Sequence, residues 1–326
     1  MRRLVATLGA AAVLAALVAL ASPSASAAPP DHSAAAEHRR VNEYWTQARR
    51  DSAVPRDIRP NARPPGSGGG GGGGGGTVTG STWTGGGDVV LVVGKVFFTL
   101  GGVDYVCSGS AVDSAIGSVV LTAGHCVHEG PGAFATNWEF CPAYNNAPHA
   151  VLDCWTARDL YTTSAWGGDG DFDDDTGFAV VHNGSATTLE GALQSAGAVH
   201  IPAIQFAQAG GTTTYSAFGY PAAGKFKGQK LTYCRAPLTG ELDNQPGTQS
   251  IRCDMTVGSS GGPWYSTFDE TAPYVVTSLN SYGYSSLKGY MFGPIFGTGE
   301  AAAFNGAGTG DCTGSPSQYR CVDLGA

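Results

Sequence analysis

The chain has 326 residues, with 18 Lys and Arg against 26 Asp and Glu, and a formal net charge of −8. Nine of the basic residues but only five of the acidic ones precede residue 77. The rest of the chain is therefore strongly acidic, which disfavours binding to a phosphate backbone and sets nucleic acid aside as a partner.

The N-terminus has the order of a secretory signal peptide. Arg2 and Arg3 come first, an apolar run follows over residues 4–21, and Ala25-Ser26-Ala27 supplies a small-residue cleavage site. An uncleaved membrane helix is the alternative, since the run is nearly long enough to span a bilayer. We expect residues 1–27 to be removed, leaving a secreted, extracellular protein that does not contact the membrane.

Residues 28–76 are polar and rich in Ala, Arg and Pro. The patch Val41-Asn42-Glu43-Tyr44-Trp45 predicts a helical turn or two, and nine consecutive glycines at 68–76 predict a flexible linker. We interpret 28–76 as a prosegment and Gly-rich linker rather than a folded domain; a permanent disordered arm is the alternative. The folded domain is then expected over residues 77–326.

From residue 85 onward, glycines separate short runs rich in β-branched and aromatic residues. This texture predicts an all-β barrel or sandwich. Helical periodicity is scarce, and residues 186–196 are the best helix candidate. The expected strands lie at residues 89–93, 95–100, 119–121, 178–181, 213–218, 230–233 and 274–279.

All eight cysteines lie after residue 100. An even number in an exported chain indicates disulfides, and the chain lacks the C-x-x-C pair that would favour a metal site. Their spacing forms four close couples. We therefore expect the pairs Cys107–Cys126, Cys141–Cys154, Cys234–Cys253 and Cys312–Cys321.

A serine lies among glycines in Gly258-Ser259-Ser260-Gly261-Gly262-Pro263. The glycines permit a tight turn that exposes the hydroxyl and lets backbone N–H groups converge on a developing oxyanion. The same letters fit the nucleophile elbow of α/β-hydrolases, and they fit a plain surface loop. An elbow enzyme needs a histidine after its serine, and none follows Ser260, so we set that class aside.

His125 lies in Thr122-Ala123-Gly124-His125-Cys126, directly after the apolar run at 119–121. A disulfide at Cys126 would pin the backbone beside this histidine, as a general base requires. His128 is an alternative without such a neighbour. The subtilisin order would need a suitable aspartate before His125, and no aspartate upstream lies in a recognisable motif. The order His, Asp, Ser therefore remains.

Leu121-Thr122-Ala123-Gly124-His125-Cys126, with Cys107-Ser108-Gly109-Ser110-Ala111 before it, resembles the histidine region of trypsin-like serine proteases. Gly258 to Pro263 resembles their serine region, and the resemblance covers roughly residues 88–296. Gly219-Tyr220-Pro221 is similar to the bacterial glutamyl-endopeptidase branch, and Tyr44-Trp45-Thr46 to the leaders of actinobacterial secreted relatives. The resemblance implies an all-β fold of two antiparallel six-stranded β-barrels with the active site in the cleft between them.

The family's aspartate begins a strand as Asp-x-Ala-aliphatic, and Asp175-Thr176-Gly177-Phe178-Ala179-Val180 fits this pattern. Asp173 and Asp174 are the neighbouring alternatives. By the resemblance, Asp175 would accept from the imidazole of His125.

The backbone N–H groups of Gly258 and Ser260 would hold the oxyanion in the same family. Ser259 replaces the aspartate that receives the new N-terminal amine in trypsin-like zymogens. We therefore expect activation that does not depend on a buried amine.

Substrate specificity stays open at this point. Asp254 lies six residues before Ser260, where trypsin-like enzymes have the base of their primary pocket, and would favour Arg or Lys there; a surface aspartate is the alternative. Ser281 and Gly283 resemble the strand that borders this pocket. Asn280, just before this strand, is expected to contact the substrate together with Asp254, Ser281 and Gly283. It stands where glutamyl endopeptidases usually have a histidine, which argues against glutamate specificity.

The resemblance implies a secreted serine endopeptidase that hydrolyses protein or peptide substrates through an acyl-enzyme. A non-catalytic secreted binding protein on the same fold is the alternative. We expect a monomer without a cofactor or metal. The acidic cluster at 169–175 lacks the glycine and glutamate of an EF-hand loop, which argues against calcium.

Overall fold

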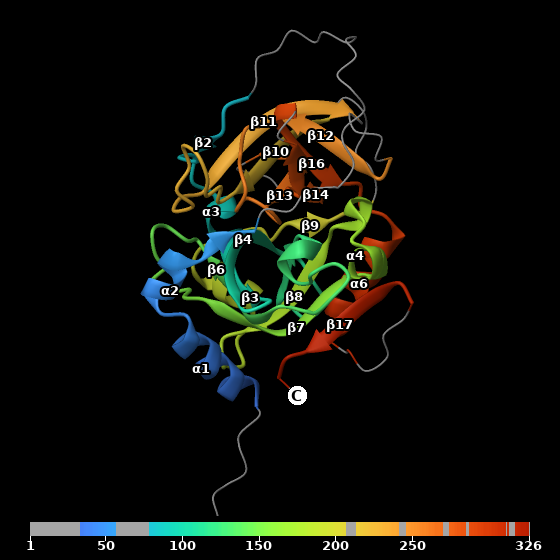
Figure 1. Ribbon diagram of the computed structural model, residues 1–326. Coiled ribbons are helices and arrows are strands. Elements are labelled where there is room, and N and C mark those ends of the chain that lie inside the picture. The colour runs from blue at the N-terminus through green and yellow to red at the C-terminus, as the bar shows by residue number, and fades with distance from the viewer. Residues whose placement is uncertain are drawn as a thin grey trace, which may run out of the picture. The chain divides into compact units, whose positions relative to one another are not determined.

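The computed structural model describes residues 33–56, 78–206, 213–240, 246–269, 274–284, 287–310, 312 and 317–325 (Figure 1). The expected signal peptide at 1–27 and the glycine run at 68–76 lie outside these residues. Within the described ranges, no helix is both long and apolar enough to cross a membrane. Two β-sheets dominate, as the strand-rich sequence predicts.

The first sheet closes into an antiparallel barrel, called the first barrel below. Its strands follow the order β4-β3-β6-β7-β8-β5, and β5 pairs back with β4. Every residue of β3 is buried. Side chains alternate between the two faces of a strand, and Trp45, from residues 33–56, packs on Phe97 at one of these faces. The six strands are β3 (Val93–Leu100), β4 (Val103–Val112), β5 (Val119–Thr122), β6 (Thr136–Pro142), β7 (Trp155–Thr163) and β8 (Gly177–His182). Two further strands join this sheet, β1 (Val54–Pro55) on β4 and β17 (Tyr319–Asp323) on β7.

The second sheet is barrel-like and is called the second barrel below. Its strands follow the order β15-β16-β12-β11-β10-β13-β14-β9, and β2 pairs with β11. Tyr215, Ile251 and Trp264 are among the buried residues of its own core. The strands are β2 (Ser81–Thr82), β9 (Ala203–Ile204), β10 (Thr214–Gly219), β11 (Thr232–Gly240), β12 (Thr248–Arg252), β13 (Pro263–Thr267), β14 (Val275–Leu279), β15 (Tyr282–Tyr284) and β16 (Leu287–Pro294). The expected pair of antiparallel barrels is confirmed.

The helices are short and lie between the strands. The helix expected at 186–196 is confirmed as α5 (Leu189–Ser195), whereas α6 (Thr298–Thr309) was not predicted. The strand expected at 89–93 is wrong, because the chain forms α3 (Asp88–Val92) there. The Asp88 carboxylate accepts the N–H groups of Val199 and His200, each at 2.8 Å, and these distant contacts fix the helical turn. The remaining short helices are α4 (Ser164–Asp169), η1 (Gly124–Cys126) and η2 (Phe172–Asp174).

All four expected disulfides are confirmed. Cys107–Cys126 and Cys141–Cys154 lie in the first barrel, Cys234–Cys253 lies in the second, and Cys312–Cys321 lies near the C-terminus.

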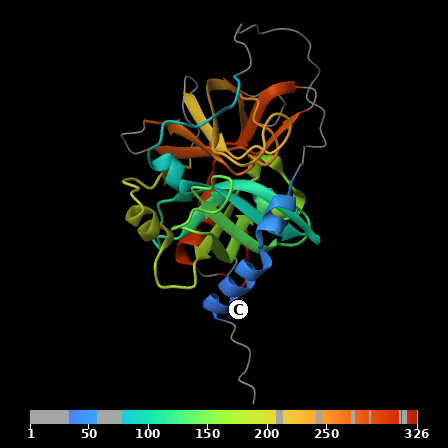
Figure 2. The same cartoon turned by 90° about the vertical axis from the view of Figure 1, so that its left-hand side faces the viewer.

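Residues 33–56, called the leader below, fold against the first barrel (Figure 2). The leader contains α1 (Ala34–Tyr44), α2 (Gln47–Ser52) and β1. The alternative of a permanent disordered arm does not fit these residues, and their role as a prosegment stays a prediction. Val41 and Trp45 are each 1% exposed and belong to the same hydrophobic core as the first barrel. This burial accounts for helices longer than the turn or two that the sequence predicts.

Candidate active site

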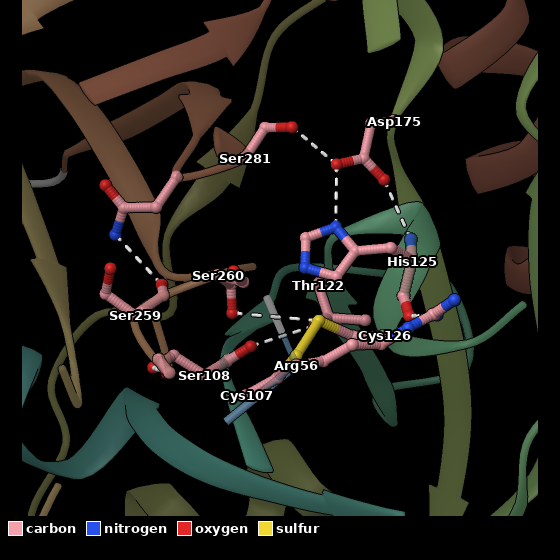
Figure 3. Close-up of a disulfide and its surroundings, with 12 residues drawn as sticks. Arg56, Cys107, Ser108, Thr122, His125, Cys126, Asp175, Ser259, Ser260 and Ser281 are labelled. Atoms are coloured by element: carbon pink, nitrogen blue, oxygen red, sulfur yellow. Dashed lines mark hydrogen bonds and ion pairs between the residues drawn. A yellow bond between two sulfur atoms is a disulfide. The ribbon is translucent and has the colours of Figure 1, made fainter. Parts of the chain in front are cut away.

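His125 lies in the η1 turn that follows β5, and its side chain is buried. Its ring Nδ1 is hydrogen-bonded to Asp175 Oδ2 at 2.8 Å, and its backbone N–H donates to Asp175 Oδ1 at 2.8 Å (Figure 3). The two bonds fix both the backbone and the ring of the histidine. Because an ionised carboxylate can only accept, Nδ1 carries the proton in the neutral ring, and Nε2 then has a free lone pair.

Asp175 lies between η2 and β8 and is also fully buried. The Ser281 hydroxyl donates to its Oδ2 at 2.5 Å. Burial by itself raises the pKa of Asp175, but the charge of His125 and the hydrogen bonds from His125 and Ser281 outweigh it. The pKa of Asp175 therefore lies below its ordinary value, and the group stays ionised at neutral pH.

Ser260 lies on a tight turn of the second barrel. Gly258 and Gly261 adopt φ values of 94° and 81°, which L side chains rarely adopt, and a Cβ on Gly261 would collide with Thr122. The turn is fixed by hydrogen bonds from Gly261 N to Asn280 O at 2.7 Å and from Ser108 N to Ser260 O at 2.7 Å. The serine hydroxyl is thus presented from a rigid backbone.

The Nε2 atom of His125 is buried, and it has no hydrogen-bond partner among the described residues. Ser260 lies on this side of the imidazole ring (Figure 3). Among the described residues, no acceptor is found for the backbone N–H groups of Gly258 and Ser260. A proton acceptor therefore lies on the side of the serine hydroxyl, and two open N–H donors belong to the turn that carries this hydroxyl. Such a set can deprotonate the hydroxyl and stabilise an anion formed beside it.

Ser259 stands in the position where the resemblance leads one to expect a charged zymogen aspartate. Its hydroxyl donates to Thr256 O at 2.8 Å, and its backbone N–H donates to the same carbonyl at 3.2 Å. A neutral contact within the turn thus takes the place of an ion pair. Activation without a buried amine stays a prediction.

A pocket of about 460 Å³ opens beside Ser260. Ser281 and Gly283, expected to border the substrate, line it. Much of the remaining wall is apolar or aromatic and comes from the segments before Ser260 and around β15 and β16. These residues are Met255, Val257, Tyr282, Tyr284, Leu287, Tyr290 and Met291.

Asp254 also lines the pocket, but its carboxylate is already engaged. Its Oδ1 accepts from Gly80 N at 2.6 Å, and its Oδ2 accepts from Lys225 Nζ at 2.7 Å. Asp254 thus holds the segment that leads into β2. This placement weakens the interpretation of Asp254 as the receptor of a basic side chain.

Asn280 is fully buried beneath the serine turn rather than in the pocket wall. Its amide nitrogen donates to Phe218 O at 2.8 Å and Ser259 O at 3.1 Å, and its oxygen accepts from Trp264 Nε1 at 2.7 Å. The structure thus differs from the expectation of substrate contact by Asn280. Its hydrogen bonds support the backbone of the serine turn instead.

Several residues of the site were not singled out from the sequence. The Ser108 hydroxyl donates to Gly258 O at 2.9 Å and accepts from Tyr220 N at 2.8 Å, and so ties the first barrel to the serine turn. Trp166 packs beside His125, with ring centroids 6.2 Å apart. Ser108 directly follows Cys107 in the motif quoted above, which is the one local signal for it; Trp166 has none.

Among the described residues, two groups of side chains have ligand atoms close enough for a metal ion. They are Cys107 with His125 and Cys126, and Glu139 with Cys141 and Cys154. In both groups the cysteines are disulfide-bonded. Because a metal takes the thiolate form, neither group fits a metal.

The chain is similar to two solved proteases at 40% sequence identity. One is AL20, a thermostable serine protease from an extremophilic microorganism, with a TM-score of 0.62 over 69% of this chain and 100% of that one. The other is the protease Anisep from Arthrobacter nicotinovorans, with a TM-score of 0.62 over 71% and 99%. A Glu endopeptidase shares the fold at 19% identity and a TM-score of 0.54, over 72% and 98%. Neither a scan against protein-family models nor a search of curated proteins finds a match.

Proposed function

We propose that this chain, which belongs to the serine proteases of the trypsin-like fold, is a secreted serine endopeptidase. Ser260, His125 and Asp175 carry its reaction. The observation that carries the proposal is the state of the His125 ring. Its Nδ1 is held by a buried carboxylate, and its buried Nε2, on the side of Ser260, has no partner among the described residues. A histidine held in this way is a general base that needs a hydroxyl as its proton donor.

In the proposed mechanism, His125 Nε2 takes the proton of the Ser260 hydroxyl as the oxygen attacks a peptide carbonyl carbon. Asp175 stabilises the imidazolium that forms. The N–H groups of Gly258 and Ser260 donate to the oxyanion of the tetrahedral intermediate. His125 then protonates the leaving amine, and the peptide C–N bond breaks to leave an acyl-enzyme. Water attacks the ester in a second half-reaction with His125 again as the base.

The test uses the secreted protein beside its Ser260→Ala variant. A fluorophosphonate probe should label the native protein at Ser260 and leave the variant unlabelled. Digestion of a peptide library, analysed by mass spectrometry, should show internal cleavage by the native protein alone. A folded, disulfide-bonded protein that neither reacts with the probe nor cleaves any peptide would contradict the proposal.

We propose further that the pocket beside Ser260 prefers an apolar or aromatic side chain. Met255, Tyr282 and Leu287 supply apolar surface, and the charge of Asp254 is already matched by Lys225. Burial of an apolar side chain there is favourable, whereas a basic side chain would compete with Lys225 for the same carboxylate. The peptide library decides this as well. Cleavage mainly after Arg or Lys, lost in Asp254→Asn, would overturn this preference.

We expect the protein to be exported from the cell. The signal-like order of residues 1–27 and four disulfides both suit an oxidising, extracellular compartment. Mass spectrometry of the protein from culture medium should find a chain that begins after Ala27.

A further inference from the structure

The first turn of α6 lies against the segment that carries Asp175. Asp174 is the last residue of η2 and directly precedes Asp175. A Cβ placed on Gly299 would lie 3.0 Å from Asp174 Oδ1 and 3.7 Å from Thr163 Cγ2. Because residue 299 has no side chain, the helix can approach this acidic segment closely.

Glu300 of α6 is a buried carboxyl with only one of its oxygens bonded to a donor. The residue is 2% exposed. Its Oε2 accepts the backbone N–H of Gly297 at 2.8 Å. Among the described residues, no donor reaches the other oxygen, Oε1, which is buried as well. An ionised carboxyl in this state is strongly unfavourable, whereas a protonated one can itself donate a hydrogen bond.

The acceptor for such a hydrogen bond is Asp174. The side chains of Glu300 and Asp174 are hydrogen-bonded to each other, which requires a proton between them because two ionised carboxylates can only accept. Burial raises the pKa of Glu300 to about 7; the Gly297 N–H opposes this rise, and the charge of Asp174 adds to it. Glu300 is therefore the member that holds the proton. We call Glu300 and Asp174 the carboxyl pair.

The charges around the carboxyl pair are negative. Burial raises the pKa of Asp174, the charge of Asp171 adds to this rise, and the hydrogen bond from Glu300 opposes it. No positive side chain among the described residues acts on either carboxyl. Asp173, the other acidic residue of η2, accepts instead from the backbone N–H of Gly247 at 3.2 Å. Loss of the shared proton would thus leave two carboxylates that repel each other.

The backbone of Asp174 determines where Asp175 lies. The carbonyl of Asp174 accepts from the hydroxyl of Thr163 at 2.8 Å. The N–H of Asp175 itself makes only a long hydrogen bond, to Phe172 O at 3.5 Å. A displacement of Asp174 would therefore pass directly to the carboxylate that orients the His125 ring.

We propose that Glu300 is a positioning residue: its carboxyl donates a hydrogen bond to Asp174, and α6 thereby holds the backbone that presents Asp175. This inference rests on the proposed function. Glu300 is not among the residues that line the pocket, so it acts on the reaction through Asp175 alone. When a rise in pH removes the shared proton, the hydrogen bond is lost, the two charges repel, and the enzyme loses rate while its fold persists.

The first arm of the test compares kcat of the full-length native enzyme and Glu300→Gln across a range of pH, corrected by active-site titration. A glutamine oxygen can accept from Gly297 while its amide donates to Asp174 at every pH. The ratio of kcat, variant to native, should be close to one at about pH 5.5 and should rise as the pH passes about 7.

Glu190→Gln is the matched control for this arm. Glu190 lies in the first turn of α5 and accepts from Ser114 N at 3.0 Å, away from the segment that carries Asp175. Its kcat ratio to the native enzyme should not change with pH. Glu300→Ala removes the hydrogen bond at every pH and should lower kcat by roughly tenfold, since small displacements of catalytic groups are costly. Glu300→Gln keeps the test valid if Glu300→Ala does not fold.

The second arm needs no activity. Hydrogen exchange of residues 172–177 is followed in full-length Ser260→Ala. Exchange there should accelerate above about pH 7, beyond the intrinsic effect of pH, because the carboxyl pair no longer holds this backbone. Glu300→Gln in the same background should remove that acceleration.

Each outcome decides the matter. A kcat ratio that does not change with pH overturns the inference and leaves the proposed function in place. A ratio that changes while hydrogen exchange does not overturns it too, since the effect would not act through the backbone. Recovery of the native rate at alkaline pH with calcium chloride, but not with sodium chloride of equal ionic strength, overturns it in favour of a cation site. A native enzyme as unreactive as Ser260→Ala at every pH overturns the proposed function, and the role of Glu300 in the reaction with it.

Discussion

The hydroxyl of Ser281 donates to Asp175 Oδ2 at 2.5 Å, and this hydrogen bond joins the two barrels at the active site. Asp175 precedes β8 of the first barrel, whereas Ser281 lies between β14 and β15 of the second. The same carboxylate oxygen is hydrogen-bonded to the His125 ring. The orientation of the histidine therefore depends on a residue of the opposite barrel.

Ser281→Ala should lower kcat/KM by roughly tenfold, since a hydrogen bond to a charged group contributes about 1.5–3 kcal/mol. Loss of this donor raises the pKa of Asp175, so the carboxylate becomes protonated at a higher pH than in the native enzyme. The fall should appear mainly in kcat, because the weakened carboxylate stabilises the imidazolium less in the transition state. Ser281→Thr, which keeps the hydroxyl, is the control, and an unchanged kcat in Ser281→Ala would count against this role.

Acidification should loosen the leader through His182 of β8. Its ring lies 5.7 Å from that of His38 of α1, and the Thr156 hydroxyl lies within hydrogen-bond distance of both rings. Burial, His38 and Arg158 lower the pKa of His182 to about 4, against a weak opposing effect of Glu37. Burial also lowers the pKa of His38, which Asp153 partly opposes.

Release of α1 removes His38 and part of this burial, so the pKa of His182 rises toward its ordinary value and protonation favours the released form. The contribution of His182 to docking is therefore at full strength above about pH 6.5 and weakens as the pH falls toward about 4. Hydrogen exchange of residues 33–56 in full-length Ser260→Ala should speed up over this range, beyond the intrinsic pH effect. His182→Gln should reduce that change. The same acceleration in both proteins would exclude His182 as its origin.

Lys95 of β3 is a buried cation that costs stability. It is 4% exposed, with Nζ 4.9 Å from the centre of the Phe97 ring and 5.0 Å from that of Tyr144. Burial lowers its pKa to about 8. Lys95→Met should raise the free energy of unfolding at pH 7 by about 1–3 kcal/mol, because the methionine keeps the chain volume and loses the charge.

The pH dependence supplies the check on Lys95. Its folded pKa lies below the unfolded value of 10.5, so the unfolded chain binds more protons between about pH 8 and 10.5. The contribution of Lys95 to stability therefore rises with pH across that window. Urea unfolding should show the advantage of Lys95→Met shrinking from pH 7 to pH 10. The exposed Lys230→Met is the control, and an advantage independent of pH would refute the explanation.

Removal of either of two disulfides should lower stability, but only one of the two removals should lower activity. Cys107→Ser with Cys126→Ser, and Cys312→Ser with Cys321→Ser, should each lower the free energy of unfolding by about 3 kcal/mol. Only the first pair should lower kcat per folded molecule, because Cys126 adjoins His125. Active-site titration corrects for unfolded protein. Equal losses of kcat in both double variants would show that the bond does not position the histidine.

Much of the fold and site follows from local sequence. Close cysteines predicted all four disulfides, because each couple lies on neighbouring segments. The turn around Ser260 was predictable because Gly258 and Gly261 supply the positive φ values that it needs. The register of residues 175–180 placed Asp175 at the start of a buried strand, and the carboxylate does reach the His125 ring.

The remainder depends on contacts between residues far apart in the chain. Residues 89–93 have the composition of a strand, yet Asp88 is bonded to Val199 and His200 and the segment turns into α3. Trp45 is buried by its contacts with β3 and β6. The polar, glycine-linked segment around it gives no local signal for these contacts. Asp254 has Gly80 as a partner, and no local pattern encodes that pair.

Because the site is divided between the two barrels, the rate of catalysis depends on how closely the barrels fit together. His125 and Asp175 belong to the first barrel, while Ser260 and Ser281 belong to the second. Two disulfides lie within the first barrel and one within the second, so a slight separation can leave both sheets intact. Mild heat or denaturant would then abolish the catalytic activity while circular dichroism still reports native strands. Cooling would restore the rate, because neither barrel has to refold.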